Sequence, residues 1–149
     1  MSKNDLSNKV AVVTGGADGI GEGIARIIRG CGAHVIIADI QEEKGKALAA
    51  ELGENVSFSL LDVTDPDSWS NLVTELQTHY GRLDILVNNA GITQDNILMR
   101  MKEEQWNQVI DTNLTALYRL SKACLRGMTK ARWGRIINVT SVVGSMGNA

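Results

Sequence analysis

Proline, cysteine and aromatic residues are scarce in this sequence. Of its 149 residues, one is Pro, one is Phe and two are Cys, while 44% are apolar and 21% are charged. This composition argues against a disordered chain, and we predict a single domain spanning residues 1–149. No apolar run approaches the ~18 residues of a membrane span, and residues 1–9 lack the apolar stretch of a secretory signal. We therefore expect a cytoplasmic protein without a membrane or nucleic-acid partner.

The few cysteine and histidine residues show no spacing typical of metal ligands. Cys31 and Cys124 each fall within a helical apolar pattern, which favours two small buried side chains. His34 and His79 have no carboxylate, Cys or second His at ligand spacing. We expect no metal site.

Charge is distributed unevenly along the chain. Residues 1–111 contain 9 basic and 17 acidic side chains, for a net charge of -8, whereas residues 112–149 contain 6 basic and no acidic side chains. The basic segment favours an acidic partner or, equally well, forms a solvated helix face.

Short apolar runs alternate with segments of helical periodicity. The runs predict buried strands over residues 10–14, 34–38, 56–60, 83–87 and 136–139. Asp65 and Pro66 indicate a helix start, because Asp caps free amides and Pro fits the first turn. Gly53 is placed to end a helix over residues 41–52. Residues 140–149, rich in Gly and Ser, are expected to form a loop.

Three of the helical segments have an apolar face. The first face consists of Ile20, Ile24, Ile27, Ile28 and Cys31. The face after Pro66 consists of Trp69, Leu72, Val73 and Leu76. A long helix over residues 103–132 has on one side Leu114, Leu117, Ser121, Cys124, Leu125 and Met128.

The order of these elements predicts the fold class. Strands that are apolar on both faces and alternate with helices indicate a parallel sheet covered on each side. We predict an α/β, doubly wound, Rossmann-like sheet of five strands with helices on both faces. Ligands of such sheets bind at the carboxyl ends of the strands.

A glycine-rich segment, Thr14-Gly-Gly-Ala-Asp-Gly-Ile-Gly21, lies between the first strand and the first helix. Glycines let the backbone turn sharply and approach a pyrophosphate, and the helix N-terminus supplies free amides and a positive dipole. The glycine spacing differs from the usual dinucleotide fingerprint, so the position after a buried strand carries the prediction. The predicted cofactor-binding residues here are Gly15, Gly16, Asp18, Gly19, Ile20 and Gly21.

Asp39 ends the second predicted strand, 18 residues after Gly21. An acidic residue at this place accepts hydrogen bonds from the adenosine ribose hydroxyls. Its charge, joined by that of Asp18, would repel a 2′-phosphate. The pattern therefore predicts a site that prefers NAD to NADP. A cap for the helix near Gln41 is an alternative role of Asp39, compatible with the first.

Further motifs along the whole chain resemble the short-chain dehydrogenase/reductase family. They are Thr14-Gly-x-x-x-Gly-x-Gly21, Asp62-Val63, Asn88-Asn-Ala-Gly91, Asn113 and Ser141. From Gly91 onward the chain is similar to bacterial 3-oxoacyl-[acyl-carrier-protein] reductases, whereas the first ninety residues resemble the family more generally. Those reductases usually use NADPH and carry a basic residue where this chain has Asp18. NADP therefore stays open as a cofactor, and a hybrid origin would explain the disagreement between the two halves.

The resemblance also implies roles for individual residues. Asp62 and Val63 would contact the adenine ring. Asn89, Ala90 and Gly91 would lie at the nicotinamide ribose. Asn113, a poor residue for a helix interior, would mark a distortion that exposes a carbonyl to a water linked to the catalytic Lys. Ser141 would donate a hydrogen bond to the substrate carbonyl.

Members of the family place a catalytic Tyr-x-x-x-Lys roughly a dozen residues beyond this Ser. Because the sequence ends at Ala149, we expect a fold that is incomplete relative to the family and a 149-residue chain that is inactive alone. Tyr118-x-x-x-Lys122 matches the spacing, but we interpret it as a coincidence on a helix surface. Strand 136–139 is then expected at a sheet edge, which favours self-association.

Three functions remain open on these residues. The first is reduction of 3-oxoacyl thioesters in the full-length form. Under this interpretation an acyl carrier protein would bind through Arg132 and its neighbours Lys130 and Arg135. The resemblance also implies a homo-oligomer, which is typical of the family. The second is a non-catalytic dinucleotide-binding fragment or engineered module. The third is a dehydrogenase of a steroid, sugar or small alcohol.

Overall fold

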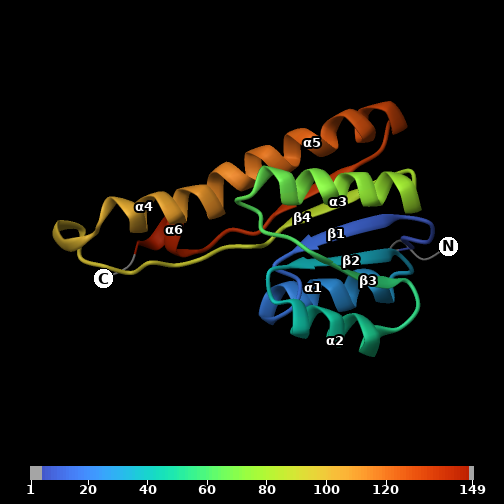
Figure 1. Ribbon diagram of the computed structural model, residues 1–149, viewed down its shortest axis with the longest axis horizontal. Coiled ribbons are helices and arrows are strands. Elements are labelled where there is room, and N and C mark those ends of the chain that lie inside the picture. Colours follow the sequence, from blue (N-terminus) through green and yellow to red (C-terminus); the bar gives the residue numbers. More distant parts are fainter. Residues whose placement is uncertain (1–4, 148–149) are drawn as a thin grey trace.

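The computed structural model describes residues 5–147 and consists of a five-stranded sheet with helices on both faces (Figure 1). The strands are β1 (Val10–Thr14), β2 (His34–Asp39), β3 (Val56–Leu60), β4 (Ile85–Asn88) and β5 (Arg135–Asn138). The helices are α1 (Gly19–Gly30), α2 (Glu42–Leu52), α3 (Pro66–His79), α4 (Glu103–Ile110), α5 (Ala116–Ala131) and α6 (Val143–Met146). A 3-10 turn spans Leu98–Arg100, and a π-helical segment, Asp111–Thr115, joins α4 to α5.

The sheet has the strand order β3-β2-β1-β4-β5, and every pair of neighbours is parallel. The chain moves outward from β1 to β3 and then returns to place β4 and β5 on the other side of β1. This is the doubly wound arrangement predicted from the sequence, and it confirms the Rossmann-like fold class. The strand order reverses between β1 and β4, which is where sheets of this kind bind their ligands.

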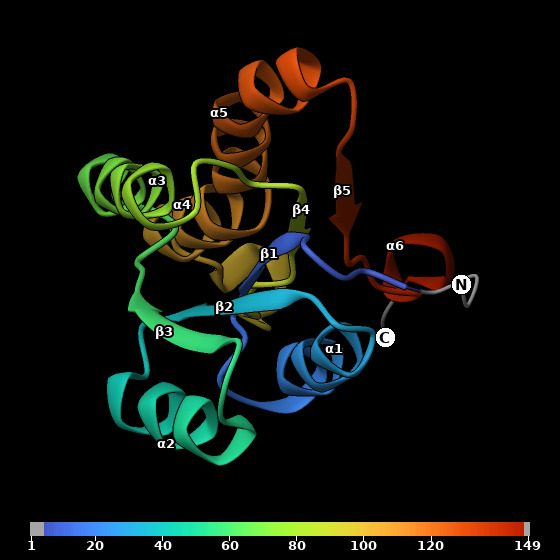
Figure 2. The same cartoon turned by 90° about the vertical axis from the view of Figure 1, so that its right-hand side faces the viewer.

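Alternate residues of each central strand enter two separate cores. Val12, Ile36 and Leu86 point to the core covered by α3 and α5, whereas Val13 and Ile37 point to the core covered by α1 and α2. Figure 2 shows the two helical layers on opposite sides of the sheet. The central strands are buried on both faces because each face meets a helix layer, as their continuous apolar sequences predict.

The helix boundaries follow the local signals closely. The Asp65 side chain accepts a hydrogen bond from the Asp67 amide at 3.0 Å, and Pro66 is the first residue of α3. Gly53 ends α2 with a φ of 74°. These local predictions are confirmed: Asp65 caps α3 with its side chain, and Gly53 closes α2 with its backbone amide, which donates to the Ala49 carbonyl.

The burial of α1 differs from the prediction. Ile20 and Ile27 are 69% and 70% exposed, and Cys31 is half-buried, whereas Gly21, Ala25 and Ile28 are buried. A side chain at residue 21 would collide with the loop that precedes the helix. The face of α1 that contains Gly21 therefore packs against the loop. This orientation of the helix turns Ile20 and Ile27 toward solvent.

The predicted long helix is interrupted, and its buried face is shifted. Residues 111–115 form a π-helical segment, which is the local distortion expected at Asn113. In α5 the buried row is Ala116, Leu120, Cys124 and Met128. Leu114 and Leu125, predicted for the apolar side, are more than half exposed. Cys124 is buried as predicted.

Three element boundaries also need correction. The fourth strand begins at Ile85 rather than residue 83 and ends at Asn88, and the fifth is Arg135–Asn138 rather than 136–139. The segment expected to be a loop contains α6, one turn of helix closed by hydrogen bonds from the amides of Met146 and Gly147. Strand β5 lies at an edge of the sheet, as expected.

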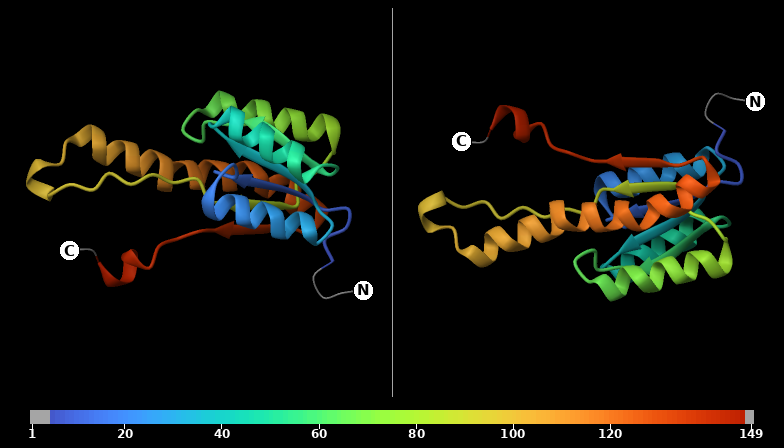
Figure 3. Two further views of the ribbon diagram at one scale, coloured as in Figure 1. Left: turned by 90° about the horizontal axis from the view of Figure 1, so that it is seen from below. Right: turned by 90° about the horizontal axis from the view of Figure 1, so that it is seen from above.

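The segment between β4 and α5 reaches beyond the carboxyl ends of the strands. Figure 3 shows residues 91–102 leading away from the sheet and α4 returning beside them, while α6 lies at the same end of the molecule. Within residues 5–147, no helix is both long enough and apolar enough to cross a membrane.

Candidate functional site

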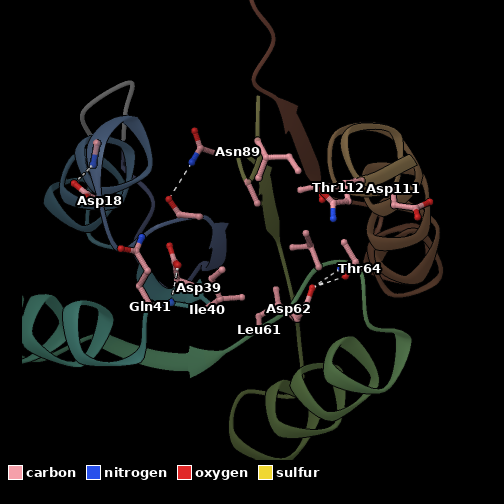
Figure 4. A pocket seen from close by; sticks show the side chains of 17 residues that line it. Asp18, Asp39, Ile40, Gln41, Leu61, Asp62, Thr64, Asn89, Asp111 and Thr112 are labelled. Atoms are coloured by element: carbon pink, nitrogen blue, oxygen red, sulfur yellow. Dashed lines mark hydrogen bonds between the residues drawn. The ribbon is translucent and has the colours of Figure 1, made fainter. Parts of the chain in front are cut away.

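A cleft of about 700 Å³ opens at the carboxyl ends of the strands, where the strand order reverses. Its lining comes from the segments that follow four strands and from the end of α4 (Figure 4). The predicted cofactor residues that line it are Gly15, Asp18, Gly19, Asp39, Asp62, Val63, Asn89, Ala90 and Gly91. The fold thus brings nine separately predicted residues to one cavity.

The glycine-rich loop is held closely against the segment after β4. Gly15 has a φ of 60°, a left-handed conformation that glycine adopts without strain. A Cβ atom at Gly21 would lie 2.0 Å from the Gly15 carbonyl oxygen and 2.6 Å from Asn89 Nδ2. Gly21 therefore lies behind the loop rather than in the cleft, and its missing side chain allows α1 to begin directly beneath the loop.

Thr14 and Asn89 connect the two halves of the sheet. The Thr14 hydroxyl donates to the Val87 carbonyl at 3.2 Å and accepts from the amides of Asn89 and Ala90 at 3.0 and 3.1 Å. Asn89 Nδ2 donates to the carbonyls of Thr14 and Gly15 at 3.1 and 3.0 Å. These bonds fix the glycine-rich loop to the end of β4.

Asp39 is 6% exposed at the end of β2. Its Oδ2 accepts a hydrogen bond from the Ala17 amide at 3.0 Å, and its Oδ1 accepts one from the Gln41 amide at 2.9 Å. Asp39 therefore anchors the glycine-rich loop and the residue that precedes α2. It does not cap that helix, whose N-cap residue is Gln41, so the alternative role is not the one observed. A carboxylate offers about four acceptor positions, of which these bonds use two, and Asp39 also lines the cleft.

Asp18 caps α1 and also forms an ion pair. Its Oδ1 accepts from the Gly19 amide at 2.7 Å, and its Oδ2 accepts from Lys44 Nζ at 2.6 Å. The hydrogen bond from Lys44, followed by that from Gly19, lowers the pKa of Asp18 below its ordinary value. The sequence alone indicated an isolated negative charge at Asp18. In the structure this charge is balanced by Lys44 of α2.

The segment after β3 forms the wall of the cleft next to Asp39. Asp62 Oδ1 accepts hydrogen bonds from the Thr64 amide at 2.9 Å and from the Thr64 hydroxyl at 2.7 Å. The Asp62 amide donates to Ser68 Oγ at 3.1 Å. These bonds hold Asp62 at the cavity beside Asp39, because β3 pairs with β2, whereas Asp18 lies on the opposite side (Figure 4).

Asn113 lies within the π-helical segment and holds the chain that leaves β4. Its Nδ2 donates to the Ile92 carbonyl at 2.8 Å, and its Oδ1 accepts from the Ile92 amide at 2.9 Å. The neighbouring Asp111 and Thr112 line the cleft, whereas Asn113 lies outside the lining and bonds the backbone of Ile92, which does line it. In this segment the Thr112 side chain faces the cavity (Figure 4), and the Asn113 side chain braces the wall through Ile92.

Five predicted residues lie outside the lining of this cavity, and Asn113, described above, is one of them. Gly16 and Gly21 are packed behind the loop, and Ile20 faces solvent. Ser141 is exposed after β5, and its Oγ accepts from the Val143 amide at 3.2 Å. Its proposed role toward a substrate stays a prediction.

The Tyr-x-x-x-Lys spacing on α5 corresponds to a surface contact. Lys122 Nζ donates to Tyr118 Oη at 3.3 Å, and Tyr118 is more than half exposed. Neither side chain lines the cleft, which agrees with the interpretation of this spacing as a coincidence.

Sequence reasoning did not find several residues of the site. Ile40, Gln41 and Thr64 directly follow predicted positions, so their neighbours were a usable signal. Gln108 carried no such signal, because helix α4 approaches the cleft only in the folded chain. The same holds for Lys44, which lies outside the lining and reaches the site through its ion pair with Asp18. In residues 5–147, no group of three or more His, Cys, Asp or Glu side chains is arranged to hold a metal ion.

Comparison with known proteins places this geometry in a family. The profile of the short chain dehydrogenase family matches residues 9–149. The 3-oxoacyl-[acyl-carrier-protein] reductase FabG of Vibrio cholerae is 52% identical over 145 residues, which cover 97% of this chain and 59% of that protein. Reductases of the same name from Escherichia coli and Chlamydia muridarum are 49% and 50% identical, and the matches cover 97% and 96% of this chain.

The chain spans 59% of the length of these relatives, and the likeness extends over residues on both sides of Gly91. The cleft at the strand reversal, the loop fixed by Thr14 and Asn89, and the match over residues 9–149 agree with one another. The chain belongs to the short-chain dehydrogenase family.

Proposed function

We propose that this chain binds a nicotinamide dinucleotide, with NAD preferred to NADP, and forms the cofactor half of an oxidoreductase that reduces 3-oxoacyl thioesters carried on an acyl carrier protein. The observation that carries the proposal is the single cleft into which the glycine-rich loop, Asp39, Asp62 and the segment after β4 all project. The substrate class rests on the names of the relatives, which are about half identical to this chain.

The residues of the cleft fit such a cofactor. The loop after β1 leads into the N-terminus of α1, where free amides and the helix dipole bind phosphate. Asp39 keeps acceptor positions for ribose hydroxyls and places a negative charge where a 2′-phosphate would carry another. Asp62 and Val63 form the wall for an adenine ring, and Asn89, Ala90 and Gly91 form the wall at the nicotinamide ribose.

When bound, the dinucleotide supplies a hydride to a ketone carbon. The contribution of this chain is to orient and to hydrogen-bond. Ser141 would donate to the substrate carbonyl oxygen and stabilise the charge that develops there. Asn113, in the π-helical segment, would leave a backbone carbonyl free to hold a water in a proton path.

The basic residues proposed to meet the carrier lie far from this chain's own cleft. Lys130 and Arg132 are exposed at the end of α5, and Arg135 begins β5. The cleft lies at the carboxyl ends of the strands, whereas these residues lie at the opposite end of the sheet (Figure 1). A carrier bound through Arg132 would therefore contact a different face from the one that opens the cofactor site.

Calorimetric titration of the 149-residue polypeptide with NAD+ and with NADP+ tests the proposal. We expect both to bind and NAD+ to have the lower dissociation constant. A reductase assay of the same polypeptide with acetoacetyl thioester should show no turnover, because Ser141 and Asn113 are present without a Tyr after Ser141. Absence of heat with both dinucleotides from folded protein would overturn the proposal, and tighter binding of NADP+ would overturn the preference.

A further inference from the structure

The ion pair between Asp18 and Lys44 joins two elements that meet at the adenosine side of the cleft. Asp18 is the residue before α1, and Lys44 is the third residue of α2, 26 positions later. The Lys44 Nζ to Asp18 Oδ2 distance is 2.6 Å, and both side chains are more than half exposed. The pair therefore links the glycine-rich loop to the helix that follows Asp39.

Lys44 also lies within electrostatic reach of Asp39. The hydrogen bond to Asp18 is the largest cause that raises the pKa of Lys44, and the charge of Asp39 adds to it. Asp39 is the residue proposed to hold the adenosine ribose, and Asp18 and Asp39 line the same cavity. A phosphate on the 2′-oxygen of that ribose would thus lie near the one cation that α2 directs toward the loop in the described chain.

We propose that the Asp18–Lys44 pair determines which dinucleotide the cleft prefers. While Lys44 is paired with Asp18, its positive charge is balanced by the Asp18 carboxylate and its ammonium group is held at the glycine-rich loop. A 2′-phosphate then meets the negative charge of Asp39 without a compensating cation. Without the carboxylate of Asp18, Lys44 has three ammonium donors to offer to the 2′-phosphate. Lys44 is then a specificity-determining residue whose effect depends on its partner.

This inference rests on the proposed binding of a dinucleotide. It predicts a different outcome from a model in which Asp18 only repels the 2′-phosphate. If Asp18 acted by repulsion alone, its removal would favour NADP+ by the same factor whether or not residue 44 is a lysine. If the pair controls Lys44, the gain must disappear when Lys44 is absent. A double-mutant cycle separates the two cases, because it isolates the coupling between two residues.

The experiment is calorimetric titration of four chains, the wild type, Asp18→Asn, Lys44→Met and the double variant, each with NAD+ and with NADP+. The measured quantity is the ratio of the two dissociation constants, in which any effect on pyrophosphate binding common to both nucleotides cancels. We expect Asp18→Asn to shift this ratio toward NADP+ by about fivefold, the upper range for one exposed ion pair. Lys44→Met and the double variant should each stay within about twofold of the wild type.

Lys46→Met is the matched control, because Lys46 lies on the same helix and its Nζ pairs at 2.6 Å with Glu42 of that helix rather than with Asp18. It should leave the ratio unchanged. An equal shift toward NADP+ in Asp18→Asn and in the double variant would overturn this inference while leaving dinucleotide binding intact. Absence of heat with either nucleotide in the wild type would instead overturn the proposed function.

Discussion

Gly21→Ala is the substitution for which the structure makes the sharpest prediction. The added methyl group would lie 2.0 Å from the Gly15 carbonyl oxygen and 2.6 Å from Asn89 Nδ2, so α1 must move away from the loop. Overpacking against a fixed backbone costs about 3 kcal/mol at the upper end of its usual range. Alanine recovers about 1 kcal/mol through its higher helix propensity. The net loss of unfolding free energy is then about 2 kcal/mol.

Gly23→Ala is the matched control, two residues further along the same helix. A Cβ atom at Gly23 would meet no described atom within 4 Å apart from its chain neighbours and the backbone of its own helix, so this variant should show only the propensity gain of about 1 kcal/mol. Thermal unfolding followed by circular dichroism should place Gly21→Ala about 4–8 °C below the wild type for a chain of this size. Gly23→Ala should melt at or above the wild type. Equal melting temperatures and equal NAD+ affinities for the two variants would refute the reasoning.

Three further predictions follow from the described contacts. Burial raises the pKa of the Cys124 thiol from 9.0 to about 12. At pH 9, iodoacetamide should therefore label the half-buried Cys31 and spare Cys124, whose reactivity should rise only as the pH approaches 12. Equal labelling of both cysteines in folded protein would contradict this. Asn113→Ala removes two hydrogen bonds to Ile92 and should lower the unfolding free energy by about 1–3 kcal/mol, with faster amide exchange at Ile92 than in the wild type; unchanged exchange would show that the side chain is not the brace. Ile137→Lys should raise the monomer fraction measured by light scattering, because β5 is an edge strand whose exposed Ile137 continues into exposed Val142 and Met146. Leu60→Lys on the other edge strand should leave that fraction unchanged, and a wild type that is already monomeric would remove the basis of the prediction.

The single-residue variants at Gly21 and Asn113 address different parts of the cleft. Gly21 controls how closely α1 approaches the loop, whereas Asn113 controls where the chain runs after β4. A loss of dinucleotide affinity in both variants, with a folded protein in each case, would locate the cofactor between the two segments. A loss of affinity in only one variant would show that the segment next to that residue contributes most of the binding free energy.

Local sequence signals were sufficient for most of the secondary structure and for part of the site. Asp65, Pro66 and Gly53 act within one turn of the helix ends they define, so their effects do not depend on the rest of the fold. The glycine-rich loop and Asp39 were found because each directly follows an apolar strand, and parallel strands place such positions at one edge of a sheet. The position of the cleft at this edge was predictable for the same reason.

Tertiary structure decided what depends on contacts between distant segments. The rotation of α1 follows from the approach of Gly21 to Gly15 and to Asn89, 68 residues further along the chain, and this contact exposed two isoleucines that helical periodicity had placed on the apolar face. The Asp18–Lys44 pair depends on how α1 and α2 pack side by side. Periodicity reports which residues share a face, but the direction in which that face points is set by the neighbour it meets.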